Sequence, residues 1–78
     1  MNREYTRAGE IVLIIEETES EGFYLYSFYP DGFEGDTNHE TLDDAKHQAE
    51  AYGVPDLRWS KVPADVKDLG AFGRQISN

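Results

Sequence analysis

The sequence predicts an α+β fold in which a small antiparallel sheet of three to four strands carries one helix on one face. A β-branched run and an aromatic run are separated by a short polar link, which favours a hairpin. An amphipathic segment with helix start and end signals follows, and a shorter apolar segment comes after it. We therefore expect one domain over residues 1–78 with the element order β-β-(β)-α-β.

The first predicted strand lies within residues 10–17, where an Ile-Val-Leu-Ile-Ile run is flanked by carboxylates. A run this rich in β-branched residues is typical of a central strand whose two faces are at least partly covered. Residues 1–9, which precede it, are polar and are expected to form a frayed lead-in. The core of the domain is therefore predicted to lie within residues 10–62.

The second predicted strand, residues 23–29, has apolar side chains on both faces. Strand alternation places Tyr24, Tyr26 and Phe28 together on one of them. Because one helix covers only one face, the other must be met by the tail of residues 63–78, by a second copy of the protein or by a foreign partner. The tail is predicted to contain one short helical turn, and it offers four apolar side chains: Val66, Leu69, Phe72 and Ile76.

The helix is predicted from its cap, its apolar stripe and its end. Thr41 is the expected N-cap, although Thr37 followed by Glu40 offers an earlier capping-box start. Gly53 suits the left-handed position that commonly ends a helix. The stripe that should lie on the sheet recurs at spacings of three and four residues: Leu42, Ala45, Ala49 and Tyr52.

Two shorter strands are expected on either side of the helix. A Pro-Asp-Gly turn ends the aromatic strand, after which residues 33–34 are predicted to add a short third strand before Gly35. The segment of residues 57–62 is predicted as the last strand, and Pro63 ends it.

The net charge of −9 limits the classes of partner. Nucleic-acid binding requires clustered lysine and arginine, and anionic membrane surfaces also attract basic segments, so neither partner is expected. The chain contains no cysteine and no secretory pattern at its start, which predicts a cytoplasmic protein. Residues 31–56 carry eight acids and one base, so a partner steered by charge should be basic and approach near the helix.

Two groups of residues are candidates for binding a protein partner. The outward face of the helix places Asp43, His47 and Glu50 toward solvent, where they form either a docking surface or an ordinary solvated helix side with local pairs. The aromatic face of the second strand, already described, is the other candidate, for a foreign protein or for self-association.

A metal or small-ligand site is the alternative function. Asp36, His39, Asp43 and His47 have oxygen and imidazole ligands, and the last three are spaced by four residues. They match no established ligand signature, and no metal or cofactor is expected. Since cysteine is absent and no serine lies in a nucleophile-elbow pattern, we predict a protein without enzymatic activity.

Three short motifs resemble the HicB-like antitoxin domain over roughly residues 10–52. They are Gly22-Phe23-Tyr24-Leu25 in a strand, Gly35-Asp36-Thr37 in a turn and Thr41-Leu42-Asp43-Asp44-Ala45 at the helix start. HicB-like proteins sequester a basic RNA-cleaving toxin, so the resemblance implies a module that neutralises a basic protein. The chain is also similar to small bacterial proteins with a Gly-Asp-Thr-x-His-x-Thr-Leu core, a similarity that implies no function.

Overall fold

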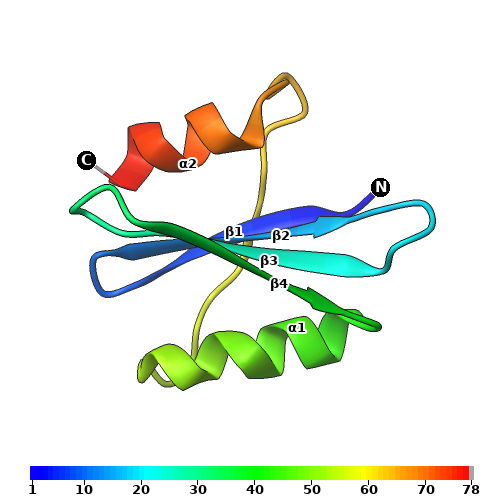
Figure 1. The fold of residues 1–78 in the computed structure, drawn as a ribbon, viewed down its shortest axis with the longest axis horizontal. Helices are drawn as coiled ribbons and strands as arrows, with labels where there is room; N and C mark the ends of the chain where they lie inside the picture. The colour runs from blue at the N-terminus through cyan, green and yellow to red at the C-terminus, as the bar shows by residue number, and fades with distance from the viewer. Residues whose placement is uncertain (78) are drawn as a thin grey trace.

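The computed structural model describes residues 1–77 and confirms the α+β class. Within these residues, one five-stranded antiparallel sheet lies between two α-helices, one on each face (Figure 1). Neither helix is long and apolar enough to cross a membrane. In chain order the elements are β1 (Arg3–Ala8), β2 (Ile11–Glu17), β3 (Phe23–Phe28), β4 (Glu34–His39), α1 (Leu42–Ala49), the short 3-10 helix η1 (Glu50–Tyr52), β5 (Ser60–Lys61) and α2 (Leu69–Ser77).

The sheet has the order β4-β3-β2-β1-β5, so β1 is an interior strand paired with both β2 and β5. The prediction of a frayed lead-in at residues 1–9 is therefore wrong. Its polar side chains find partners far along the chain: the hydroxyl of Thr6, for example, donates to the carbonyl of Arg58 at 2.7 Å. A polar strand can lie inside a sheet when such bonds satisfy it.

Among these polar residues, Glu4 has the greatest need of partners, because its charged carboxylate is buried against α1. Lys46 of α1 lies 3.3 Å from one carboxylate oxygen, and the amide of Asn2 donates to the other at 2.5 Å. Burial by itself raises the pKa of Glu4, but the hydrogen bonds and the charges of Lys46 and Lys61 lower it overall. This cluster joins the first strand to α1 and to β5.

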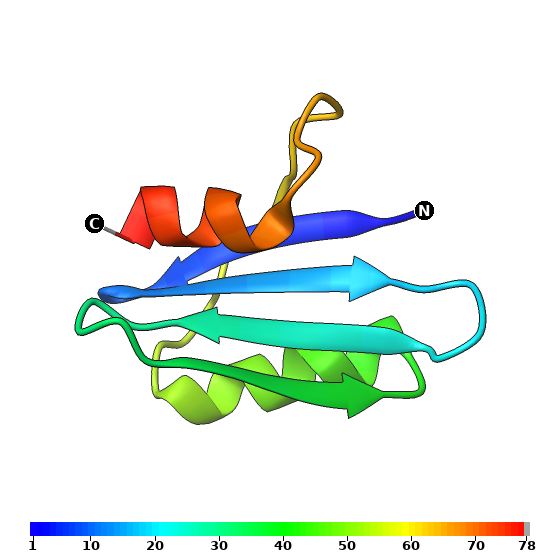
Figure 2. The same cartoon turned by 45° about the horizontal axis from the view of Figure 1, so that its top comes forward.

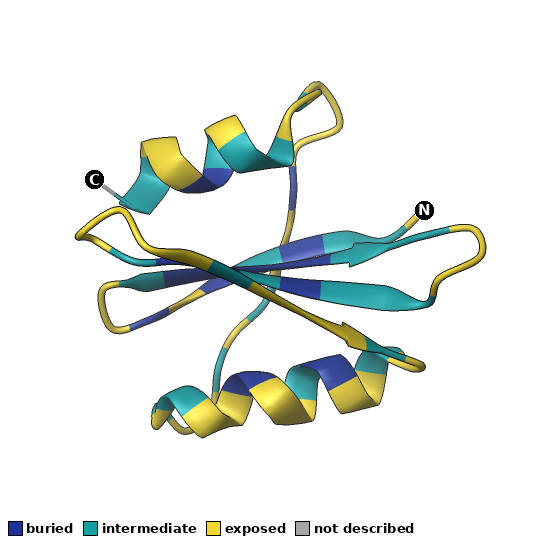
Figure 3. Cartoon of the chain, viewed as in Figure 1, coloured by how far each residue is buried: buried dark blue, intermediate teal, exposed yellow. Residues whose placement is uncertain are grey.

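The central strand β2 is buried on both faces, as predicted. Leu13 and Ile15 lie in the core beneath α1, while Val12 and Ile14 lie in the core beneath α2, and all four are fully buried. The sheet therefore separates two hydrophobic cores (Figure 3).

The predicted helix is confirmed in its start, its face and its end. The hydroxyl of Thr41 accepts a hydrogen bond from the backbone N–H of Asp44 at 3.1 Å. Ala45 and Ala49 are fully buried against the sheet, and η1 ends at Gly53 with a left-handed φ of 84°. The alternative start at Thr37 is excluded, since that residue lies in β4.

The tail forms the second helix, α2, instead of one short turn, and Asp68 accepts a hydrogen bond from the backbone N–H of Ala71 at its start. The apolar side chains of α2 and Val66 cover the core of Val12, Ile14 and Phe28. Of the three expected covers, the tail is therefore the one that packs on this part of the second sheet face. Gly73 permits this packing, because a Cβ there would lie 2.4 Å from the ring of Phe28.

The two short strands also differ from the prediction. The third strand extends through Gly35, Asp36 and Thr37, which were expected in a turn, and becomes the edge strand β4. The last strand shrinks to Ser60–Lys61, while Trp59 still packs on the core beneath α1. Contacts with the core, and not strand pairing, thus explain the apolar residues of this segment.

Candidate functional site

The helices α1 and α2 lie on opposite faces of the sheet (Figure 2), so the two predicted partner surfaces lie on opposite sides of it. Asp43, His47 and Glu50 are exposed on the outer side of α1, where His47 lies 3.5 Å from Glu50 in a local pair. Tyr24 and Tyr26 lie on the sheet face that α2 shares. The chain therefore presents two separate candidate surfaces, and they differ in kind.

The helix surface is fully solvated. The side chains of His47 and Glu50 are 86% and 66% exposed, and their contact is an i, i+3 pair of the sort that ordinary helices carry. Such an arrangement supplies charge but no shaped recess. It gives little basis for selecting one partner over another.

The aromatic surface is shaped by a pair of parallel rings. Tyr24 and Tyr26 are half-buried, with ring centroids 5.9 Å apart and planes inclined by 9°. Phe28, the third residue predicted here, is only 5% exposed because α2 lies over it. Phe28 therefore belongs to the core, and two tyrosines remain available on this face.

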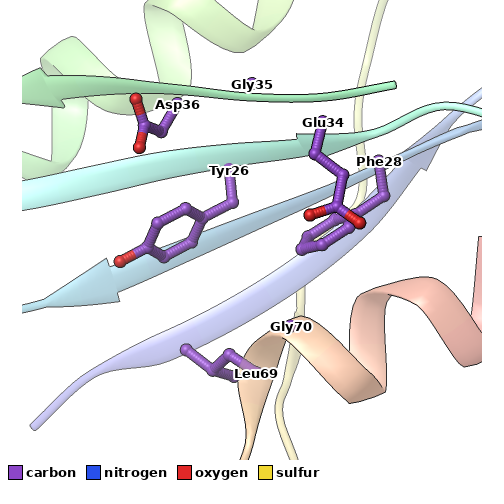
Figure 4. Close-up of a pocket in the computed structure, with 7 residues that line it drawn as sticks. All are labelled: Tyr26, Phe28, Glu34, Gly35, Asp36, Leu69 and Gly70. Carbon is purple, nitrogen blue, oxygen red and sulfur yellow. The ribbon is translucent and has the colours of Figure 1, made fainter. Parts of the chain in front are cut away.

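An open groove begins where the cover of α2 ends. It has a volume of about 440 Å³ and lies between β3 and β4 on one side and the first residues of α2 on the other (Figure 4). Tyr26, Leu69 and Phe28 supply its apolar surface, and the carboxylates of Glu34 and Asp36 project from β4 beside it. Apolar and acidic groups thus meet in one recess.

The phenol of Tyr26 is fixed by a carboxylate that the sequence analysis did not select. Its hydroxyl donates to Glu16 of β2 at 2.9 Å. Burial, this hydrogen bond and the nearby charges of Glu16 and Asp36 raise the pKa of Tyr26 well above its usual value. The hydrogen bond to Glu16 holds the phenol in one orientation.

The β4 side of the groove carries two acidic side chains, Glu34 and Asp36. The two carboxylate oxygens of Glu34 accept hydrogen bonds from the guanidinium of Arg74 of α2 at 3.3 and 3.2 Å. In the sheet register Asp36 lies opposite Tyr26 and Glu34 opposite Phe28, so both carboxylates share the face of α2. Of the two carboxylates that line the groove, Glu34 is paired with Arg74, and Asp36 lies opposite Tyr26.

The alternative metal or ligand site around Asp36 and His39 is not assembled. His39 pairs with Phe23 and Asp36 with Tyr26, so the two side chains point to opposite faces of β4. The ring of His39 is hydrogen-bonded to Thr37 at 2.7 Å. Within residues 1–77 no group of three or more His, Asp or Glu side chains is arranged to hold a metal ion.

No protein-family model matches the chain, and neither a curated protein nor a solved structure matches it significantly. The functional argument consequently depends on the geometry of the groove. The sequence analysis named Leu69 as one of the apolar side chains of the tail, but it selected neither Glu34, which lines the groove, nor Glu16, which holds Tyr26. Alternation along β2 and β3 could have placed Glu16 near Tyr26, whereas Glu34 required the register of β4.

Proposed function

We propose that the protein is a non-enzymatic interaction module that binds a basic segment of another protein at the groove of Tyr26, Glu34 and Asp36. The observation that carries the proposal is the meeting of a half-buried tyrosine pair with projecting carboxylates beside an apolar recess. A lysine or arginine side chain complements both parts of this groove, since its apolar stem suits the apolar surface and its cationic end suits the carboxylates.

The contacts available to such a side chain are specific. The aliphatic stem can pack on Leu69 and the ring of Tyr26, while the cation interacts with the aromatic face and with Asp36. Arginine and tyrosine are both enriched at protein interfaces for this reason. The net charge of −9 adds electrostatic attraction that would accelerate association with a basic partner.

The resemblance to HicB-like antitoxin domains also supports a basic protein as the partner. A domain of that kind neutralises a basic protein, and an acidic groove beside stacked aromatic rings is chemically suited to doing so. We extend the proposal accordingly: the partner is a basic protein whose charged segment is covered when the complex forms.

A short peptide of alternating arginine and glycine is a suitable probe, titrated into the isotopically labelled protein and followed by NMR. We expect amide shifts centred on Tyr24, Tyr26 and Asp36, and an affinity that falls as salt is added. Tyr26→Leu and Asp36→Asn should each weaken binding about two- to five-fold.

The matched control is the other acidic surface. Asp43→Asn and Glu50→Gln each remove one charge from the outside of α1, as Asp36→Asn removes one from the groove. If the helix variants weaken binding and the groove variants do not, the site lies on α1 and the proposal for the groove is wrong. If the peptide produces no shifts at low salt, the proposed function itself fails.

A further inference from the structure

We infer that the partner binds as an added strand: an extended segment with lysine or arginine at alternate positions pairs antiparallel with the free edge of β4. This inference depends on the proposed function and specifies its mode. It requires a backbone edge that is open, long enough and correctly phased, and side chains at that edge that select a basic segment over a second copy of this chain.

The first requirement is met by the position of β4, which is the outermost strand at its end of the sheet (Figure 1). It spans six residues in unbroken register with β3, whereas the strand at the opposite edge, β5, has two. The sequence of β4 is Glu-Gly-Asp-Thr-Asn-His, which contains neither the proline nor the lysine that commonly block edge pairing.

The phase of the hydrogen-bond ladder decides which backbone groups face outward. The N–H of Tyr29 donates to the carbonyl of Phe33 at 2.9 Å, so this pair is hydrogen-bonded and the pairs beyond it alternate. Gly35 and every second residue after it consequently bond to β3. The backbone groups that remain on the free edge belong to Glu34, Asp36 and Asn38.

An independent bond in the turn between β2 and β3, at the other end of β3, gives the same phase. The N–H of Thr18 donates to the carbonyl of Gly22 at 2.8 Å, which makes Tyr26 a residue hydrogen-bonded to β2. Since a strand residue directs its N–H and carbonyl to one side, Tyr26 is not bonded to its β4 neighbour Asp36. Asp36 therefore directs its own backbone groups outward.

The outward residues also carry the side chains on the groove face. Glu34, Asp36 and Asn38 are exposed and lie on the face of Tyr24 and Tyr26. Residues directly opposite in an antiparallel pair have Cβ atoms about 4.5–5.5 Å apart, so alternate side chains of an added strand would lie next to both carboxylates. Backbone pairing and charge recognition thus occur on the same strand.

Charge selects the occupant. In a symmetric antiparallel pairing of two β4 strands, Asp36 and Glu34 of one copy would approach the same carboxylates of the other, and like charges across strands are destabilising. A partner strand with lysine or arginine at alternate positions converts each of these contacts into an attraction. The same side chains then reach the tyrosine pair and the groove.

The test compares two peptides with the full-length protein. The first alternates lysine and threonine; the second has the same sequence with N-methyl groups on the backbone nitrogens that would face β4, so charge and side chains are retained while pairing is blocked. We expect the methylated peptide to bind about tenfold more weakly or worse. Hydrogen exchange at the amides of Glu34, Asp36 and Asn38 should slow only with the unmodified peptide.

Each result has a defined meaning. Equal binding of both peptides would overturn strand addition while leaving the basic-partner proposal intact, and binding by neither would remove both. Asp36→Pro provides a check within the protein, because it deletes an outward N–H and should weaken the unmodified peptide more than Asp36→Asn does. A dimer in light scattering that Asp36→Pro abolishes would instead assign the edge to a second copy and overturn the inference.

Discussion

The two faces of the sheet are closed by helices in different ways. On the α1 side, Ala45 and Ala49 bring the helix backbone close to the strands, and α1 contacts β2, β3 and β4. On the α2 side, Gly73 allows a similarly close approach at Phe28, but α2 packs on β2 and β3 and meets the outer strand at the exposed pair of Arg74 and Glu34. The complete cover stabilises the domain, and the incomplete cover leaves the tyrosine groove and the β4 edge open.

The comparison is tested most strongly by truncating one fully buried residue on each face of β2. Leu13→Ala and Ile14→Ala should each lower the free energy of unfolding by about 2–5 kcal/mol, measured by urea denaturation. Comparable losses would show that α2 closes a true core. A loss at Ile14 far below that at Leu13 would mean that α2 is detached for much of the time.

The close approach of α2 is tested at its buried glycine. Gly73→Ala places a Cβ 2.4 Å from the ring of Phe28 and should destabilise the protein by about 1–3 kcal/mol in the same measurement. Gly70→Ala is the matched control, because its Cβ would meet only the mobile ends of Arg74 and Asp68 at 3.1–3.3 Å. Since alanine also favours a helix, that variant should be neutral or slightly more stable.

If Gly73→Ala is as stable as the parent protein, α2 does not pack on Phe28 as described. If the clash between the new Cβ and the ring of Phe28 causes the loss, the double variant Gly73→Ala with Phe28→Leu, which replaces the ring by a smaller side chain, should recover part of the lost stability.

The smallest expected effect concerns the buried carboxylate on the α1 side. Because the folded pKa of Glu4 is below its usual value of 4.5, its stabilising contribution is present at neutral pH and is lost as pH falls below about 4.5. Glu4→Gln should cost about 1–2 kcal/mol at pH 7 and should flatten the acid limb of the stability curve.

Glu34→Gln is the control for that measurement, since it removes a carboxylate whose pairing with Arg74 is exposed on the α2 side. An exposed pair contributes little, so both the stability and its pH profile should change less than for Glu4→Gln. Equal flattening by the two variants would contradict a special role for the buried cluster.

The helix α1 and the central strand could be predicted because their signals are local. Thr41, the alanines of the stripe and Gly53 indicate the start, the buried face and the end of the helix through contacts with nearby residues in the chain. The apolar run of β2 indicates a buried strand by its composition alone. β1 could not be predicted in this way, because the partners that satisfy Glu4 and Thr6 are Lys46 and Arg58, which only the tertiary fold brings near.

In the tail and in the candidate site, too, the features that were missed depend on tertiary contacts. Gly73 weakens a helix in sequence terms, yet its missing side chain is what lets α2 approach Phe28. Tyr24 and Tyr26 were placed on one face by alternation alone, whereas Phe28 could not be separated from them until α2 was seen to cover it. Recognition of the groove required the register of β4 against β3.

The strand order also separates pairings that are local in the chain from one that is distant. The first four strands form a meander of sequence neighbours, so their hairpins need only short loops, while β5 joins β1 across more than fifty residues of chain. α1 can cover its core as soon as the meander exists. Val12, Ile14 and Phe28 depend on α2 for their cover, so any chain in which α2 is not docked presents one apolar face, a surface of the kind that promotes aggregation.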